Sequence, residues 1–206
     1  MVKKISVDKL DDKERGYLVG LFTGDGYLNY CKSDRHYRVD FYLNAKKDQA
    51  ILFYLKRLLS TLGLNPYTVR CRGSTRVSCN SKEFMELIGQ EKRRILKSKT
   101  VSKEYALGLI SGFIDADGNV GKGDIVIVKK DRRTLLFFKR LAEDALKVKT
   151  RLWLRIIRFK GVLPIWNLRL SMDFRRLPHN SCKVHAYNER GGYHHSERNK
   201  EVAYKG

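Results

Sequence analysis

The chain has 206 residues, and its 43 Lys and Arg against 22 Asp and Glu give a formal net charge of +21. With 42% hydrophobic and 11% aromatic residues it is too apolar for a disordered basic tail, and its length suits one domain or two small ones. A charge excess of this size does not favour an ordinary metabolic enzyme or a protein adaptor, and it indicates a polyanionic partner, usually nucleic acid.

The basic charge is spread over the whole chain. Residues 1–100 carry 21 basic and 11 acidic side chains and residues 101–206 carry 22 and 11, so the halves hold +10 and +11. A partner that both halves touch, such as a duplex lying across the molecule, fits this distribution better than a partner held by one end. A lysine-rich solvated surface is the simpler alternative.

Membrane attachment and secretion are not expected. No apolar run approaches the roughly 18–20 residues of a spanning helix, and residues 1–12 contain no signal-like apolar stretch. The four cysteines include no Cys-x-x-Cys pair, which favours reduced thiols over a disulfide framework or a zinc finger. We therefore expect the cytoplasm of a prokaryote or archaeon, or the interior of an organelle.

An internal repeat relates residues 16–26 (GYLVGLFTGDG) to residues 108–118 (GLISGFIDADG) at an offset of 92 residues. Small residues four apart form one stripe along a helix and let two helix backbones approach closely. Each segment is therefore predicted to be a helix that packs on the other and ends at its last glycine in a left-handed cap. The interface residues are Gly16, Gly20, Gly24, Gly108, Gly112 and Ala116.

The remaining elements follow from alternation and helical periodicity. After the first motif helix we expect a strand over 37–43, a helix over 47–62, strands over 67–71 and 75–79, and a helix over 81–88. After a charged linker over 91–103 and the second motif helix we expect a strand over 125–128, a helix over 132–146, strands over 152–157 and 165–170, and a short helix from Ser171.

The order predicted for each half is α-β-β-α-β-β-α, with one strand more than the elements placed above, and it predicts an α+β fold of two half-domains. The boundaries are 1–97 for the first half, 98–178 for the linker and second half, and 179–206 for a polar C-terminal tail without helical or strand period. Four of the five histidines and Cys182 lie in this tail, but their spacing matches no zinc pattern.

Two acids occupy matching places in the repeat. Asp25 and Asp117 each stand at the C-terminal end of a motif helix, where the helix dipole disfavours negative charge. If the glycine stripes bring the helices together, the carboxylates are stabilised by a cation between them, which predicts a divalent metal site of the Mg²⁺ type. The carbonyls of Gly24 and Ala116, in the last turns, are further candidate ligands. Taken alone, each Asp-Gly pair is ordinary turn chemistry.

The strings LVGLFTGDG (18–26) and ISGFIDADG (110–118) resemble the LAGLIDADG motif, and two copies at this spacing resemble the monomeric, intron-encoded LAGLIDADG homing endonucleases. The resemblance extends to about residue 177, and it implies saddle-shaped antiparallel sheets over DNA, packed through the two motif helices. It also implies site-specific cleavage of one phosphodiester on each strand of a long asymmetric target, with Mg²⁺ or Mn²⁺ as cofactor.

In this family the two motif acids hold the metal, so the resemblance assigns that role to Asp25 and Asp117. A basic or polar residue near the end of the first strand of each half orders water around the site. Lys129 or Lys130 is the candidate in the second half. In the first half the candidates are Asn44, Ala45 and Lys46, of which Lys46 carries the charge.

Alternation along the strands leaves one face of each sheet for a DNA groove. In the first half the candidates are Arg38, Tyr42, Arg70, Arg72 and Arg76. The outward residues of the first strand are expected to be His36, Arg38, Asp40 and Tyr42, and one side of the second hairpin is expected to carry Thr68, Arg70, Arg72, Arg76 and Ser78. In the second half they are Arg151, Arg155, Asn167 and Arg169. Arginine is the usual reader of guanine, although a phosphate contact is the commoner role of any single arginine.

Two other functions remain open on the same scaffold. One is an RNA maturase that binds its host intron RNA and assists splicing. The other is a DNA-binding protein that has lost cleavage. Retention of both acids argues against a pure binder, because losing one acid would relieve repulsion without weakening binding.

Overall fold

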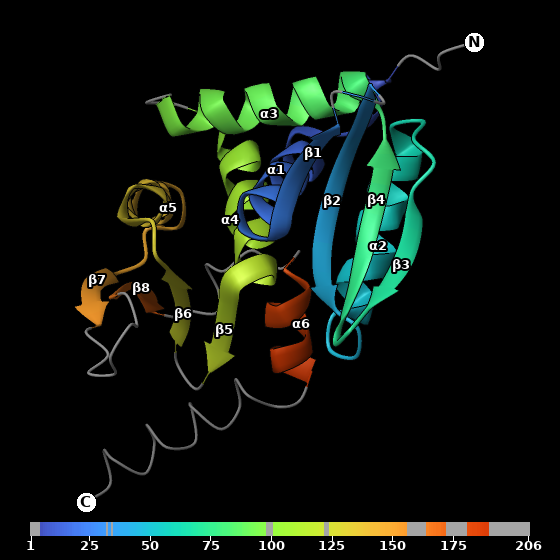
Figure 1. Cartoon of the computed structure of the whole chain (residues 1–206). Helices are drawn as coiled ribbons and strands as arrows, with labels where there is room; N and C mark the ends of the chain where they lie inside the picture. The colour runs from blue at the N-terminus through green and yellow to red at the C-terminus, as the bar shows by residue number, and fades with distance from the viewer. Residues whose placement is uncertain are drawn as a thin grey trace, which may run out of the picture. The chain divides into compact units, whose positions relative to one another are not determined.

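The computed structural model describes residues 5–31, 33, 35–97, 101–121, 124–155, 164–171 and 181–189. These residues form two compact units, 1–116 and 117–206 (Figure 1). The short helix expected from Ser171, the strand end at 156–157 and the tail histidines 179, 194 and 195 lie outside the described residues. None of the described helices is long and apolar enough to cross a bilayer, and none of the four cysteines forms a disulfide.

The first unit contains a four-stranded antiparallel sheet in the order β1-β2-β4-β3. Its elements are a short 3-10 helix η1 (Val7–Lys9), α1 (Asp12–Asp25), β1 (Gly26–Cys31), β2 (His36–Asn44), α2 (Gln49–Thr61), β3 (Tyr67–Cys71), β4 (Ser74–Asn80), α3 (Lys82–Lys97) and α4 (Lys103–Asp117), whose last residue belongs to the second unit.

The second unit contains a sheet of the same topology, β5-β6-β8-β7. Its elements are β5 (Gly118–Gly121), β6 (Asp124–Lys129), α5 (Arg132–Leu146), β7 (Thr150–Arg155), β8 (Ile165–Ser171) and α6 (Cys182–Glu189). The predicted α+β class and the order α-β-β-α-β-β-α are confirmed. The contacts group α4 up to Ala116 with the first unit, whereas the predicted boundary after residue 97 follows the sequence repeat.

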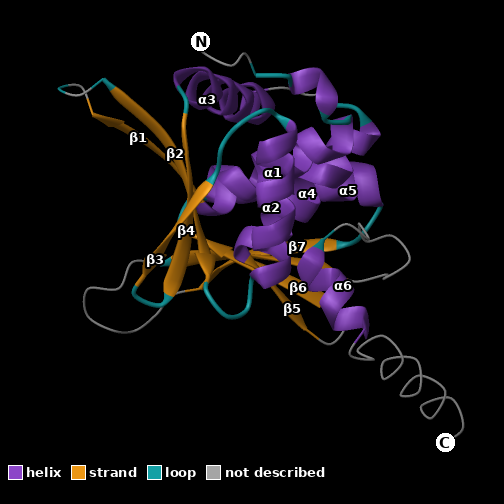
Figure 2. Ribbon diagram, turned by 90° about the vertical axis from the view of Figure 1, so that its right-hand side faces the viewer, coloured by secondary structure: helices purple, strands orange, loops and turns teal. Residues whose placement is uncertain are grey.

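Local sequence explains where these elements begin and which face they bury. Asp11 and Glu14 form a reciprocal capping box that starts α1, and Asp131 accepts two backbone N–H bonds at the start of α5. In β2 the alternating Val39 and Phe41 are completely buried. Figure 2 shows α1 and α2 on one side of the first sheet, so this face is the core face and the other is turned away from these helices.

The motif helices α1 and α4 pack through their glycines, as predicted. The contacts advance by four residues along both helices together, so the helices run parallel. A Cβ atom on any of the four glycines would lie 1.9–2.2 Å from a carbonyl oxygen of the other helix, the pairs being Gly16 with Tyr105, Gly20 with Leu109, Gly108 with Lys13 and Gly112 with Tyr17. Gly24 and Ala116 continue the stripe by spacing, and their part in it stays a prediction.

A buried hydrogen bond adds to this helix pair. The Tyr17 hydroxyl of α1 donates to Asp115 Oδ2 of α4 at 2.8 Å, and both residues are completely buried. Thr23, which matches Asp115 in the repeat, instead donates to Val19 O within its own helix at 2.7 Å. The two motif copies therefore differ chemically at the residue two positions before the final acid.

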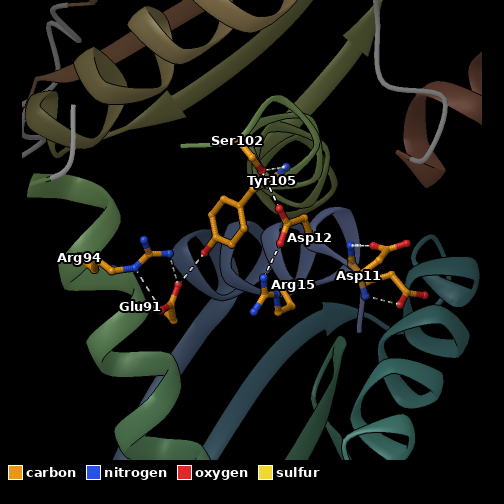
Figure 3. A network of polar contacts seen from close by, with 8 residues as sticks. Asp11, Asp12, Arg15, Glu91, Arg94, Ser102 and Tyr105 are labelled. Carbon is orange, nitrogen blue, oxygen red and sulfur yellow. Dashed lines mark hydrogen bonds and ion pairs between the residues drawn. The ribbon is translucent and has the colours of Figure 1, made fainter. Parts of the chain in front are cut away.

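The prediction that the helix after β4 ends near Ile88 and is followed by a linker was wrong. The helix α3 continues to Lys97 because Ile95 is completely buried and Glu91 has partners on two elements. Figure 3 shows Glu91 between Arg94 Nη2, at 2.8 Å, and the Tyr105 hydroxyl, at 2.9 Å. Burial raises the pKa of Glu91, but these hydrogen bonds outweigh burial and lower it below its usual value.

A second part of this network joins α1 to the start of α4. The Ser102 hydroxyl donates to Asp12 Oδ2 at 2.8 Å, and Asp12 also pairs with Arg15 (Figure 3). The segment that was expected to be a linker is therefore held to α1 and α3 by side chains.

The tail was expected to show no regular structure from residue 179 on, whereas α6 occupies residues 182–189. The Ser181 hydroxyl accepts the Val184 N–H at 3.2 Å at the start of the helix, and Val184 is 1% exposed. Because only one strongly buried apolar side chain anchors this short helix, its sequence carries no detectable period.

Candidate active site and nucleic-acid interface

Each motif acid is the last residue of its helix and is followed directly by a strand. Gly26, after Asp25, has φ −89° and ψ 146°, so the predicted left-handed cap was wrong. Glycine is needed there for space, because a Cβ atom at Gly26 would lie 2.0 Å from the ring of Phe22. Asp25 is thus held at the junction of α1 and β1, and Asp117 at the junction of α4 and β5.

The second unit brings Asp117 and Lys129 together. The Lys129 ammonium at the end of β6 lies 2.7 Å from Asp117 Oδ2, and each side chain is 21% exposed. This Oδ2 is shielded from solvent and accepts no hydrogen bond of regular geometry from the described residues, so its compensation comes from the ion pair. Of the two candidates Lys129 and Lys130, Lys129 is the one that contacts the motif acid, and the chemical role of both residues stays a prediction.

The first unit places an apolar residue where the second has Lys129. Gly26 pairs with Phe41 and Gly118 pairs with Ile127, so two residues further along the strands Leu43 corresponds to Lys129. Leu43 is 2% exposed. Lys46 lies in the turn beyond β2, where its N–H donates to Asn44 Oδ1 at 3.0 Å, so the register does not make it the counterpart of Lys129.

Oxygen donors at the helix ends fit a hard divalent cation in type. Asp117 offers a shielded carboxylate oxygen that pairs with the Lys129 ammonium. A metal ion would bind this oxygen beside the ammonium or in its place. Gly24, Asp25 and Ala116 already interact with other groups, so their ligation of a metal stays a prediction. Among the described residues no group of three or more His, Cys, Asp or Glu side chains could hold a metal ion.

Sequence reasoning missed a lysine close to the second motif acid. Lys183 Nζ of α6 donates to the carbonyl oxygen of Gly118, the residue after Asp117, at 3.0 Å. A basic residue in a segment without periodicity gives no signal of this contact, because the helix that carries it was not predicted.

The groove face of the first sheet follows from the strand register. On β2 and β4 it includes Arg38, Asp40, Tyr42, Arg76 and Ser78, which agrees with the predicted outward set on these strands. On β3, Tyr67 pairs with Ser78, Val69 with Arg76 and Arg70 with Thr75, so Arg70 lies on the opposite face from Arg76 and the prediction that they share a side was wrong. Arg72 lies in the exposed turn between β3 and β4.

The second sheet presents Arg151 and Arg169 as direct partners across β7 and β8, with Trp153 opposite Asn167. Arg151, Arg155 and Arg169 are exposed. Asn167 lies on the predicted face but is only 3% exposed, and its Nδ2 has no hydrogen-bond partner among the described residues. Thus Asn167 offers little surface to a ligand in this conformation, which differs from the expected outward role.

Three residues of the groove face, Tyr27, Tyr67 and Asp40, were not predicted as functional. Tyr27 and Tyr67, on the edge strands of the first sheet, are 58% and 37% exposed and flank the row of Asp40 and Ser78. Asp40 itself is completely buried. A hydrogen bond with Tyr42 raises the pKa of Arg76, which keeps this guanidinium charged beside Asp40.

Comparison with known proteins agrees with this geometry. The profile of the LAGLIDADG-like domain family matches residues 104–192. The structure of I-DmoI in complex with DNA and Ca shares the fold with a TM-score of 0.65 at 21% identity, over 80% of this chain and 85% of that chain. Residues 104–192 are thus identified as a LAGLIDADG-like domain, and the fold of the chain is that of I-DmoI. The resemblance read from the two motifs is thereby confirmed.

Two further solved structures share the LAGLIDADG fold. I-DmoI with DNA and Mn has a TM-score of 0.66 at 21% identity, over 84% of this chain and 97% of that chain. Full-length DUF199/WhiA from Thermatoga maritima has a TM-score of 0.54 at 12% identity, over 79% of this chain and 52% of that chain. No curated protein matches the chain in sequence.

Proposed function

We propose that the protein is a monomeric, site-specific double-strand DNA endonuclease that uses a divalent metal ion, Mg²⁺ or Mn²⁺. The observation that carries the proposal is the Asp117 carboxylate at the end of a motif helix with Lys129 2.7 Å away. Support comes from the fold, since I-DmoI, a homing endonuclease, has been solved with DNA together with Ca, Mn and Mg.

In this proposal Asp25 and Asp117 hold the metal through carboxylate oxygens, with the carbonyls of Gly24 and Ala116 as further ligands. When bound, the ion polarises the scissile phosphate and lowers the pKa of a bound water. Lys129 keeps the Asp117 carboxylate in place and puts a positive charge next to the phosphate that is attacked. The leaving 3′-oxygen develops negative charge, which a nearby ammonium stabilises.

The two sheet faces bind the duplex. Arg38 and Arg76 on the first sheet and Arg151 and Arg169 on the second lie on groove faces, and the two faces differ in composition. Such faces favour an asymmetric target. The net charge of +21 supports strong and salt-dependent binding.

A DNA-binding protein without double-strand cleavage is the second candidate. The observation in its favour is Leu43, which gives the first unit no charged counterpart of Lys129. Incubation with Mg²⁺ and plasmids that carry uninterrupted candidate insertion sites separates the two functions. Linear product supports the endonuclease, and tight binding without any cut supports the binder. Preferential binding to structured intron RNA would favour a maturase.

A further inference from the structure

The groove face of the first sheet contains a completely buried carboxylate. Asp40 lies in the middle of β2, on the side opposite Val39 and Phe41 of the core. The Ser78 hydroxyl donates to its Oδ1 at 2.6 Å, and Arg38 Nε donates to its Oδ2 at 3.0 Å. Burial of an acid on the face away from the core is costly unless its partners are well placed, and here the partners are supplied by three side chains of the same face.

The two arginines around Asp40 both turn the same atom toward it. Arg38 Nε is hydrogen-bonded to Asp40, and Arg76 Nε lies 3.9 Å from Oδ1. Their side chains are only 20% and 21% exposed. In Arg38 the bond to Asp40 uses Nε and leaves open the end-on edge, which consists of one N–H of each terminal Nη group. Arg76 Nε makes no hydrogen bond to the described part of the chain, and this arginine is held by the charge of Asp40 and by a hydrogen bond with Tyr42. Within the described residues the Nη groups of Arg38 form no hydrogen bond, so this edge is available to a ligand on the face.

The second sheet contains a similar arrangement built from other positions. Arg169 Nε lies 2.6 Å from Asp124 Oδ2. By strand register Asp124 is the counterpart of Arg38, and Arg169 is the counterpart of Ser78. The repeat that produced the two halves therefore does not account for the shared arrangement, and the common factor is the face on which both lie.

We propose that Asp40 is a positioning residue that presents the Nη edges of Arg38 and Arg76 to guanine bases in the major groove, and that Asp124 does the same for Arg169. This rests on the proposed function, since it presupposes that these faces bind duplex DNA. Two hydrogen-bond donors in a fixed plane match O6 and N7 of guanine. A guanidinium already held by a carboxylate loses less conformational freedom on binding, and its partly neutralised charge favours base reading over phosphate contact.

The test is selection of bound duplexes from a randomised library, in Ca²⁺ to limit cleavage, by the wild type and by Asp40→Asn. The wild type should enrich guanine at two positions that Asp40→Asn reads about tenfold or more less selectively. Affinity for the random library should fall by less than threefold, because the variant keeps both arginines. Asp124→Asn is the matched control: it should relax one different guanine position and leave the two Asp40-dependent positions unchanged.

Arg38→Lys and Arg76→Lys keep the charge and remove the planar fork, so each should relax one of the two positions that Asp40→Asn relaxes together. These variants also decide the matter if Asp40→Asn does not fold. Unchanged base preference in Arg38→Lys and Arg76→Lys, or in a folded Asp40→Asn, would overturn the inference. Failure of the wild type to bind any duplex would instead refute the proposed function, so the two failures are distinguishable.

Discussion

Replacing Gly112 of α4 by alanine tests the close approach of the two motif helices. The new Cβ would lie 2.0 Å from Tyr17 O and 2.7 Å from Leu21 N. Ordinary contact begins at 3.4 Å, so the helices must separate by about 1.4 Å or the backbone must distort. Both neighbours are backbone atoms of α1, which cannot rotate away as a side chain would.

We expect Gly112→Ala to lower the free energy of unfolding by about 3 kcal/mol, the upper part of the usual range for overpacking. For a chain of this length this corresponds to a fall in the melting temperature of about 6–12 °C. The loss includes part of the hydrogen bond between Tyr17 and Asp115, which spans the same pair of helices. Urea denaturation followed by circular dichroism measures the change.

Gly89→Ala in α3 is the matched control. Its Cβ would meet Leu28 Cδ1 at 3.3 Å and Arg93 Nη1 at 3.8 Å, both of which are ends of flexible side chains. Because alanine favours a helix interior over glycine, we expect this variant to be stabilised by about 0.5–1 kcal/mol. Equal stability of Gly112→Ala and the wild type would refute the parallel, glycine-mediated packing of α1 on α4.

Three further predictions use other contacts. Tyr17→Phe removes the hydroxyl that donates to the buried Asp115 carboxylate and should cost about 1–3 kcal/mol in urea unfolding, and a loss below about 0.5 kcal/mol would contradict the buried bond. Glu91→Gln should lower the free energy of unfolding by about 1 kcal/mol at pH 7. Because the pKa of Glu91 is lowered in the folded state, this carboxylate stabilises the protein fully above its unfolded pKa near 4.5, and the stabilisation is lost as the pH falls through the folded pKa. Glu86→Gln, which removes an exposed ion pair, should change the stability little at any pH. If the proposed nuclease is active, nicked plasmid should precede linear product, since the first unit has Leu43 at the position of Lys129. Lys129→Met should slow the first nick by about 100-fold, whereas Lys130→Met should not slow it. Equal nicking rates for the wild type and both variants would remove Lys129 from the site.

Periodicity along the chain was sufficient for the repeated element order and for the glycine interface. The four glycines recur at a spacing of four, which leaves one stripe of each helix without side chains, and this stripe is where the two helices meet. The alternation of Val39, Phe41 and Leu43 identified the core face of β2 correctly. These features depend on local spacing, which a sequence shows directly.

Features that depend on how strands pair were not accessible in the same way. The prediction for Arg70 was wrong because the tight turn at Arg72 and Gly73 pairs Cys71 with Ser74, and a shift of one residue in register moves every side chain to the other face. The correspondence of Leu43 with Lys129 also needs the pairings of Gly26 and Gly118. The role of Asp40 as a shared partner of two arginines depends on β2 and β4 being adjacent.

The most direct test of the proposed endonuclease compares the wild type with Asp117→Asn on a plasmid that carries the uninterrupted target site, with Mg²⁺ present. The wild type should produce linear DNA, and Asp117→Asn should bind the same site with similar affinity and leave both strands intact. Full cleavage by Asp117→Asn would contradict the account, as would binding without cleavage by the wild type.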